Sequence, residues 1–355
     1  MRGSHTVPEF LIGSREIGSG RPVYVVAEMS ANHNQDLERA IAIVHEAKRA
    51  GADAIKLQTY TPDTMTIDCD DERFRLGPGT VWAGETLYSL YRRAATPWEW
   101  HPALVELADS LDMDCFSTPF DDSAVEFLEQ LDVPAYKIAS FELTDVQLLE
   151  RVAKTGKPVI LSTGMASLSE IDEAVRTLRG AGAASVALLK CTSAYPAPVE
   201  DMNLRTIPHL ATAFEVAVGL SDHTFGIEVP VAAVALGASI IEKHLTLSRR
   251  DPGPDSSFSL QPDEFCAMVE AVRNCEKALG RVTYGVTDGE VQSRSFRRSL
   301  FAVNDIAEGE VLTSKNVRSI RPGVGLHPRF LREILGRHAR CSIPRGTPLR
   351  WDLIS

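Results

Sequence analysis

The sequence predicts a (β/α)8 TIM barrel followed by a small β-rich module, and three observations lead to this fold class. Eight short apolar runs rich in β-formers recur along the chain, polar residues follow each run, and amphipathic stretches such as 37–52 separate them. Alternating strands and helices build a parallel sheet, and eight such units close it into a barrel. The runs are 23–29, 54–59, 114–120, 135–140, 158–164, 186–193, 217–222 and 239–246.

The periodic pattern stops near residue 283, which indicates a domain boundary. We expect a catalytic barrel over residues 1–282, a linker over 283–295 and a small module over 296–355. The last segment is too short for another barrel unit, and its glycine turns are typical of a β-rich fold. The first five residues, MRGSH, resemble an expression tag, and we assign them no role.

The net charge of the chain changes sign at about the same boundary. Residues 296–355 contain 11 Lys and Arg but 5 Asp and Glu, a net charge of +6; the whole chain carries −11, so the remainder carries −17. This split suggests that the basic module docks on an acidic barrel, its own or a neighbour's. The module lacks the basic and aromatic pattern of nucleic-acid-binding proteins, so we expect no nucleic-acid partner.

Cysteine spacing and hydropathy predict a cytoplasmic protein. None of the six cysteines forms a CxxC pair, which favours reduced thiols over a zinc ribbon or a disulfide framework. No run approaches the roughly 18 apolar residues that a membrane span needs. The N-terminus also lacks the apolar core of a signal peptide. We therefore expect no membrane partner.

Polar residues end all eight runs, where the active site of a barrel lies. Lys56, Lys137 and Lys190 occur at these ends beside many Ser and Thr hydroxyls. Ammonium groups flanked by hydroxyl donors form a site for phosphate or carboxylate. The alternatives are ordinary surface lysines or one Schiff-base lysine.

His223 and His244 end the seventh and eighth runs, so their imidazoles can converge on one point. Two imidazoles with room for water and a substrate oxygen form an open metal site; the alternative is a pair of structural, hydrogen-bonded histidines. Because no thiolate-rich ligand set accompanies them, we expect Mn²⁺, with Mg²⁺ or Co²⁺ as alternatives. Glu28 and Glu142 end the first and fourth runs, and they either transfer protons or form salt bridges with the strand-end lysines.

Several longer motifs add a resemblance to a known family. They are AEMSANHNQ, KLQTY, FSTPFD, YKIASFE, ILSTGM, LLKCTSAYPAP, GLSDHT, IEKHLT, DPGPDSSFSL, RSLFA and RPGVG. In these motifs and their order, nearly the whole chain resembles the sialic acid synthase family, and within it the branch that makes pseudaminic acid. The tail resembles the antifreeze-like (SAF) module that ends these synthases.

The resemblance implies an enzyme that condenses phosphoenolpyruvate with an open-chain 2-acetamido sugar and releases phosphate by C–O cleavage. It implies that His223 and His244 bind the metal and that Glu142 is the acid/base. Ser193 departs from the asparagine of some family members. For phosphoenolpyruvate, the matching residues are Lys56, Thr118, Lys137, Ser140, Ser162, Ser193 and Ser221; on the sugar or metal side they are Glu28, Gln58, Tyr195 and Asp255.

Arg321 matches the tail arginine that, in the family, reaches into the partner subunit's barrel. The resemblance therefore implies a homodimer with a domain-swapped C-terminal module. The charge split between module and barrel agrees with this arrangement.

Features near the expected pocket favour 2,4-diacetamido-2,4,6-trideoxy-L-altrose as the sugar. Phe141 stands where glycine is commoner in the family, Lys190 stands where many members have histidine, and residues 80–101 contain Trp82, Trp98 and Trp100. Apolar surface suits the methyl of a 6-deoxy sugar, although the tryptophans can instead pack helices on the barrel. The alternative activities are those of an N-acetylneuraminate or legionaminate synthase, a class II type aldolase using pyruvate, and a non-catalytic sugar-binding barrel.

Overall fold

The computed structural model describes residues 9–355, and the MRGSH segment lies outside them. The chain divides between Gly280 and Arg281 into two compact units. Each unit has a hydrophobic core of its own, which makes each a separate folding domain.

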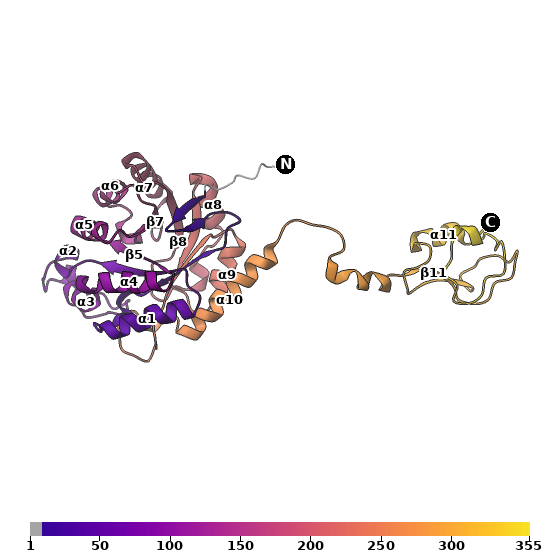
Figure 1. The fold of residues 1–355 in the computed structure, drawn as a ribbon, viewed down its shortest axis with the longest axis horizontal. Coiled ribbons are helices and arrows are strands. Elements are labelled where there is room, and N and C mark those ends of the chain that lie inside the picture. The colour runs from indigo at the N-terminus through magenta and orange to yellow at the C-terminus, as the bar shows by residue number, and fades with distance from the viewer. Residues whose placement is uncertain (1–8) are drawn as a thin grey trace. The chain divides into compact units, whose positions relative to one another are not determined.

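A closed barrel of eight parallel strands forms the first unit, as the sequence predicts (Figure 1). The strands follow chain order around the barrel, and the last strand pairs with the first. His244 lies opposite Glu28, which lies opposite Lys56, so the register brings distant segments together at the C-terminal end. The strands are β3 (Tyr24–Glu28), β4 (Ala54–Thr59), β5 (Asp114–Pro119), β6 (Tyr136–Ile138), β7 (Val159–Ser162), β8 (Val186–Cys191), β9 (Ala217–Asp222) and β10 (Ile240–His244).

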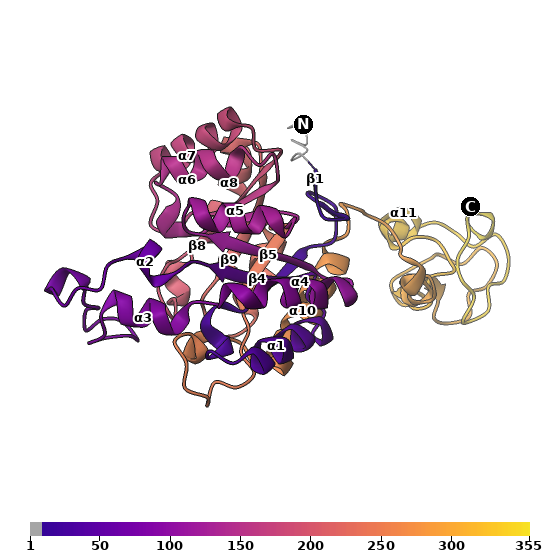
Figure 2. The same ribbon diagram turned by 60° about the vertical axis from the view of Figure 1, so that its left-hand side comes forward.

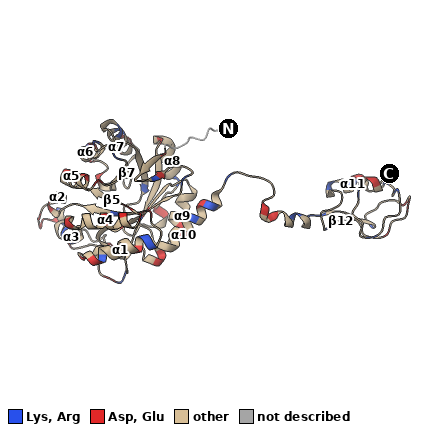
Figure 3. Cartoon of the chain, viewed as in Figure 1, with Lys and Arg blue, Asp and Glu red and all other residues tan. Residues whose placement is uncertain are grey.

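Helices surround the strands in both ribbon views (Figures 1 and 2). In the first long helix, Ala40, Ile43, Val44 and Ala47 form the buried face, and Asp36 caps its N-terminus. Charged residues remain on the outer surface, as Figure 3 shows for α1 and α10. The helices are α1 (Leu37–Arg49), α2 (Pro62–Met65), α3 (Leu87–Ala94), α4 (His101–Ser110), α5 (Asp122–Gln130), α6 (Val146–Ala153), α7 (Leu168–Ala181), α8 (Thr206–Phe214), α9 (Glu228–Ala235) and α10 (Pro262–Leu279).

An N-terminal hairpin precedes the barrel, an element that the sequence analysis missed. Its strands β1 (Phe10–Ile12) and β2 (Arg15–Ile17) are antiparallel and joined by a two-residue turn. Ile12 and Ile17 are fully buried within the barrel core. The guanidinium of Arg15 lies 3.5 Å from the carboxylate of Asp114, the first residue of β5. The hairpin therefore covers the N-terminal end of the barrel, opposite the end that carries the expected site.

The second unit is β-rich, as predicted. Strands β11 (Ser299–Ala302) and β12 (Val317–Ile320) pair antiparallel, and further single β-bridges and the short helix α11 (Leu331–Ile334) complete it. Leu300, Leu312, Ile334 and Leu349 are among its buried core residues. Residues 283–295, expected to be a linker, are exposed along their length and contain short 3-10 helices.

All six cysteines are free thiols, of which Cys115 and Cys191 are buried and Cys341 is exposed. Within residues 9–355, every helix is too short or too polar to cross a membrane. Cys191, at the end of β8, lines the pocket described next.

Candidate active site

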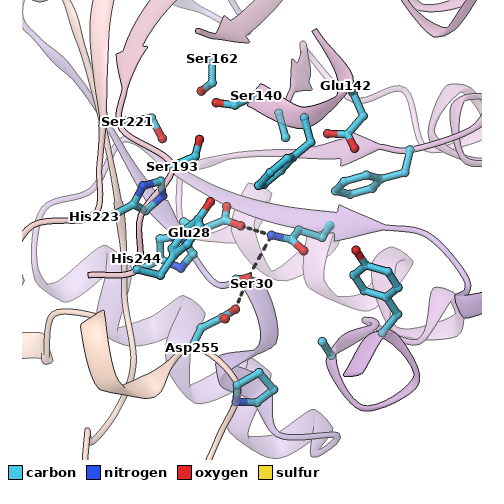
Figure 4. A pocket seen from close by; sticks show the side chains of 18 of the residues that line it. Glu28, Ser30, Ser140, Glu142, Ser162, Ser193, Ser221, His223, His244 and Asp255 are labelled. Atoms are coloured by element: carbon cyan, nitrogen blue, oxygen red, sulfur yellow. Dashed lines mark hydrogen bonds between the residues drawn. The ribbon is translucent and has the colours of Figure 1, made fainter. Parts of the chain in front are cut away.

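One pocket at the C-terminal ends of the barrel strands gathers nearly all the predicted site residues (Figure 4). Its volume is about 430 Å³. Thr118 lies beside it, where its hydroxyl accepts a 3.4 Å hydrogen bond from Lys56. The predicted residues in its lining are Glu28, Lys56, Gln58, Lys137, Ser140, Glu142, Ser162, Ser193, Tyr195, Ser221, His223, His244 and Asp255.

Two lysines and two carboxylates form a buried charge cluster on the pocket floor. The Lys56 ammonium lies 3.1 Å from Glu28 and 3.2 Å from Glu242, and the Lys137 ammonium lies 3.8 Å from Glu242. Ser221 donates a 3.0 Å hydrogen bond to the Glu242 carboxylate. Glu242 lies in the eighth run but is not among the predicted site residues, so the sequence prediction missed the group that contacts both lysines.

Burial and neighbouring charges set the protonation of this cluster. Burial raises the pKa of Glu28, and the nearby Lys56 ammonium only partly offsets this effect. Burial also opposes the charge of Glu242, but the ammonium groups of Lys137 and Lys56 outweigh it and lower the pKa of that carboxyl. Two ammonium groups therefore face one firmly ionised carboxylate, an arrangement that favours an anionic ligand.

Serine hydroxyls from neighbouring strand ends face the same pocket that the two lysines line (Figure 4). Ser140 accepts a 3.0 Å hydrogen bond from the backbone N–H of Gly164, and the buried Ser162 hydroxyl has no partner. A Cβ at Gly164 would lie 2.2 Å from the Ser193 hydroxyl, so only glycine leaves these hydroxyls in place. An unpartnered buried hydroxyl beside two lysines suits a phosphate or carboxylate oxygen.

The two histidines lie side by side, with ring centroids 5.3 Å apart. His223 uses Nδ1 in a 3.0 Å hydrogen bond to the Thr192 carbonyl, which leaves its Nε2 for a ligand, and the buried Nδ1 of His244 has no partner. Each ring thus keeps a nitrogen available, as a metal ligand requires. Within residues 9–355 no group of three or more His, Cys, Asp and Glu forms a metal site. The residues that would hold a metal here are His223 and His244.

A hydrogen-bonded chain of polar residues connects Glu28 with Asp255 (Figure 4). Gln58 donates to Glu28 at 2.9 Å and to the Ser30 hydroxyl at 3.0 Å. Ser30 in turn donates to Asp255, which also accepts from the backbone N–H of Ala31 at 3.2 Å. Asp255 is therefore held in place by the segment after β3, and Ser30 is a site residue that the sequence analysis did not select.

Glu142 lies apart from this chain, at the end of a short 3-10 helix, Ser140–Glu142, that follows β6. One of its buried carboxylate oxygens has no hydrogen-bond partner. Burial raises the pKa of Glu142 to about 7. A carboxyl with a pKa near neutrality can both give and accept a proton, as general acid/base chemistry requires.

Apolar side chains form the outer wall of the pocket. Trp82 lies in the lining; its indole N–H donates to the Pro254 carbonyl at 2.8 Å, and its ring packs on Tyr195 at 5.7 Å between centroids. Trp98 stacks on Phe127 and Trp100 packs on His33, both away from the lining. One of the three tryptophans therefore faces the pocket, and the other two pack the fold.

Comparison with known proteins shows the family to which the chain belongs. The family model "NeuB family" matches residues 43–284, and the model "SAF domain" matches residues 297–355. The chain belongs to the NeuB family. A solved structure, that of a Bacillus subtilis spore coat polysaccharide biosynthesis protein, is 36% identical with a TM-score of 0.66, and the match covers 98% of this chain and 99% of that one.

The curated relatives of this NeuB-family chain match it from end to end. The pseudaminic acid synthase of Helicobacter pylori is 46% identical, over 94% of this chain and 98% of the relative. The pseudaminic acid synthase of Campylobacter jejuni (strain 81-176) is 47% identical, over 93% and 96%. The N,N'-diacetyllegionaminic acid synthase of Legionella pneumophila is 36% identical, over 96% and 97%.

Besides Thr118, two predicted residues of the NeuB-family chain lie outside the pocket lining. Lys190, expected to help bind an anion, instead donates to the Cys191 carbonyl at 2.6 Å and to the Thr192 hydroxyl at 3.2 Å, so that interpretation is wrong. Because neighbouring side chains alternate across a strand, Cys191 faces the pocket and Lys190 faces the opposite side of β8. Arg321 belongs to the second unit, where it is exposed, and its role stays a prediction.

Proposed function

We propose that this NeuB-family protein condenses phosphoenolpyruvate with 2,4-diacetamido-2,4,6-trideoxy-L-altrose, giving pseudaminic acid and phosphate. The observation that carries the proposal is a pocket in two parts, with lysines and hydroxyls on the floor and an apolar outer wall that contains Trp82. The higher identity to pseudaminic acid synthases than to a legionaminic acid synthase supports this sugar.

In this proposal the pocket floor binds phosphoenolpyruvate. The Lys56 and Lys137 ammonium groups neutralise the phosphate and carboxylate of phosphoenolpyruvate. The free Ser162 hydroxyl donates a hydrogen bond to an oxygen of one of these two anionic groups. The Glu242 carboxylate sets the spacing of the two lysines because it contacts both. The enol carbon C3 then faces the acceptor across the pocket.

Glu142 supplies the proton transfers. Carbon C3 of phosphoenolpyruvate forms a bond to the aldehyde carbon, and the protonated Glu142 gives its proton to the aldehyde oxygen. The resulting carboxylate takes a proton from the water whose oxygen bonds to C2. Collapse of this intermediate turns the added C2 hydroxyl into a carbonyl and breaks the C2–O bond to phosphate. The hydroxyl proton leaves with the departing phosphate. A pKa of about 7 suits both steps, because neither protonation state is strongly favoured at neutral pH.

The test of this function is a panel of acetamido sugars with phosphoenolpyruvate, with phosphate release as the readout. We expect kcat/KM for the trideoxy sugar to exceed that for N-acetylmannosamine by about 10- to 200-fold, the range for one well-matched pocket contact. Equal or better use of N-acetylmannosamine would assign the protein to the ordinary sialic acid synthases. A class II type aldolase would use pyruvate and release no phosphate.

We further propose that His223 and His244 bind a catalytic Mn²⁺. The free nitrogen of His244 and the carbonyl-oriented ring of His223 support this site. When bound, the cation polarises the acceptor aldehyde. A chelator should abolish phosphate release, and added Mn²⁺ should restore it. His223→Ala should keep the fold and lose turnover, whereas the exposed His209→Ala should keep both; full activity in excess chelator would refute the metal site.

A homodimer in which the module of each chain serves the barrel of its partner is the assembly that we propose. The net charges of +6 and −17 on the two parts support mutual attraction. Phe141, Met165, Val199 and Phe225 follow neighbouring strands at the pocket end of the barrel, and each is at least 55% exposed. Such an apolar rim is typical of a surface that another chain covers. Light scattering should therefore give about twice the chain mass.

We also propose that the protein acts in the cytoplasm. Its six free thiols suit a reducing compartment, because paired cysteines are the usual form outside the cell. Subcellular fractionation of the source cells, followed by detection of the protein in the cytoplasmic fraction, tests this location.

A further inference from the structure

Lys190 is a partly buried cation whose contacts are all with the chain near it. Its ammonium donates to the Cys191 carbonyl at 2.6 Å and to the Thr192 hydroxyl at 3.2 Å. No carboxylate of residues 9–355 forms an ion pair with it. A lysine held in this way loses hydration without gaining a countercharge, so its position requires a structural or functional reason.

The turn after β8 connects Lys190 with the histidine pair. The Thr192 carbonyl accepts the 3.0 Å hydrogen bond from Nδ1 of His223, and the Thr192 hydroxyl donates to the Asp201 carbonyl at 3.3 Å. Three residues later, the Tyr195 ring packs on the His223 ring at 4.4 Å between centroids. The direction of the Thr192 carbonyl therefore determines how the His223 ring is oriented.

The Lys190 ammonium fixes this turn from the outer side of the strand. It binds the carbonyl that precedes Thr192 and also the hydroxyl of Thr192, so it restrains the peptide unit on one side and the side chain on the other. Without it, the Cys191 carbonyl loses a charged donor, and the peptide bearing the His223 acceptor can rotate. A residue that orients a ligand's hydrogen-bond partner commonly changes metal affinity by about 10- to 100-fold.

We propose that Lys190 is a positioning residue that orients His223 for metal binding through the backbone of Thr192. This inference rests on the metal site of the proposed function, but not on the identity of the sugar or on the condensation itself. It gives a role to a cation that lies outside the pocket lining.

The test measures Mn²⁺ binding directly, by electron paramagnetic resonance of the free ion, in the full-length protein. Lys190→Met keeps the length of the aliphatic stem and removes the charged donor. We expect its Mn²⁺ affinity to fall about 10-fold. Lys190→Arg keeps a cationic donor and should bind Mn²⁺ more tightly than Lys190→Met. Equal losses in the two variants would show that the hydrogen bonds of the cation are not the cause.

The matched control is Lys157→Met. Lys157 is also partly buried, but it precedes β7 at the opposite end of the barrel and pairs with Glu129 and Asp132. Its loss should lower the thermal midpoint and leave Mn²⁺ affinity unchanged. If Lys157→Met weakens Mn²⁺ binding as much as Lys190→Met does, the effect is one of general stability and the proposal fails.

A double-mutant cycle tests the route through Thr192. Thr192→Val removes the hydroxyl that Lys190 binds, so the double variant should lose less affinity than the sum of the two single losses. Strictly additive losses would contradict this route. If Lys190→Met binds Mn²⁺ with wild-type affinity, the proposed role of Lys190 is wrong and the proposed reaction is unaffected. If the wild-type protein binds Mn²⁺ but releases no phosphate, only the proposed reaction is wrong.

Discussion

At the scale of single residues, Glu142 illustrates a pKa set by burial. No basic group forms an ion pair with its carboxylate within the described chain, and one of its oxygens lacks a hydrogen bond. Burial moves its pKa from 4.5 to about 7. In this pH window the folded state holds more protons than the unfolded state, so the free energy of unfolding falls as pH rises.

Glu142→Gln removes this titration. Relative to the wild type, the variant should gain stability between pH 4.5 and 7, by at most roughly 3 kcal/mol for a shift of this size. It should also lower kcat by about 10²- to 10⁴-fold, because the proton transfer is lost. Denaturant unfolding at pH 5 and pH 8 measures the first effect and phosphate release the second. Glu126→Gln, an exposed change on α5, is the control that should alter neither.

The residue scale also shows where sequence reasoning is reliable. Strand-end position found Lys56, Lys137 and both histidines, because a barrel strand delivers its last inward side chain to the pocket. The same rule misjudged Lys190, whose side chain faces the other way. Counting alternation from Cys191 would have revealed this, since adjacent strand residues point to opposite faces.

At the scale of elements, the N-terminal hairpin was missed although its signal is present. The short segments FLI and REI flank Gly13–Ser14, a dipeptide typical of a tight turn, and Gly13 has a φ of 55°. The hairpin lies outside the eight repeated units, the first of which begins at residue 23, so the repeat does not predict it. Their burial shows that a barrel also needs its N-terminal end covered.

The hairpin provides a matched pair of substitutions. Ile12 is fully buried and Leu11, beside it, is 55% exposed. Ile12→Ala should lower the free energy of unfolding by about 2–5 kcal/mol, and Leu11→Ala by less than about 0.5 kcal/mol. Because the hairpin lies at the end opposite the pocket, neither should change KM for either substrate at temperatures where both variants are folded. Denaturant titration and steady-state kinetics check this, and a changed KM in Ile12→Ala would contradict the separation of the two ends.

The segment between α2 and α3 is the element that we expect to select the sugar. It carries Trp82, which is fixed by the Pro254 carbonyl and by Tyr195. Trp82→Ala should lower kcat/KM for the trideoxy sugar about 10- to 200-fold and affect N-acetylmannosamine less, since the lost contact is apolar. Trp100→Ala should reduce stability but leave the ratio between sugars unchanged, because Trp100 packs against His33. If Trp82→Ala leaves the ratio of kcat/KM between the two sugars unchanged, Trp82 does not determine the choice of sugar.

At the scale of the whole molecule, the two units and the barrel topology followed from the sequence because each depends on a repeated pattern. Period, strand count and the change of composition near residue 283 are properties of many residues together, so single exceptions do not alter them. The arrangement of module and barrel, in contrast, cannot be predicted from a repeated pattern. The arrangement that we propose would depend on a few contacts, such as one at Arg321, that no periodicity encodes.

The shared-site assembly makes the last prediction, and subunit mixing tests it. Arg321→Ala and Glu142→Ala should each be nearly inactive, the first because its module lacks the guanidinium that can bind several sugar oxygens at once. If modules serve the partner's barrel, mixed dimers of the two variants contain one barrel with intact Glu142 and an intact Arg321 from the other chain. Phosphate release should then recover towards one active site in four when subunits exchange freely, because half of the dimers are mixed and each has one complete site of two. Each variant mixed with itself is the control. If every module serves its own barrel, no mixture gains activity, and the domain-swapped dimer is excluded.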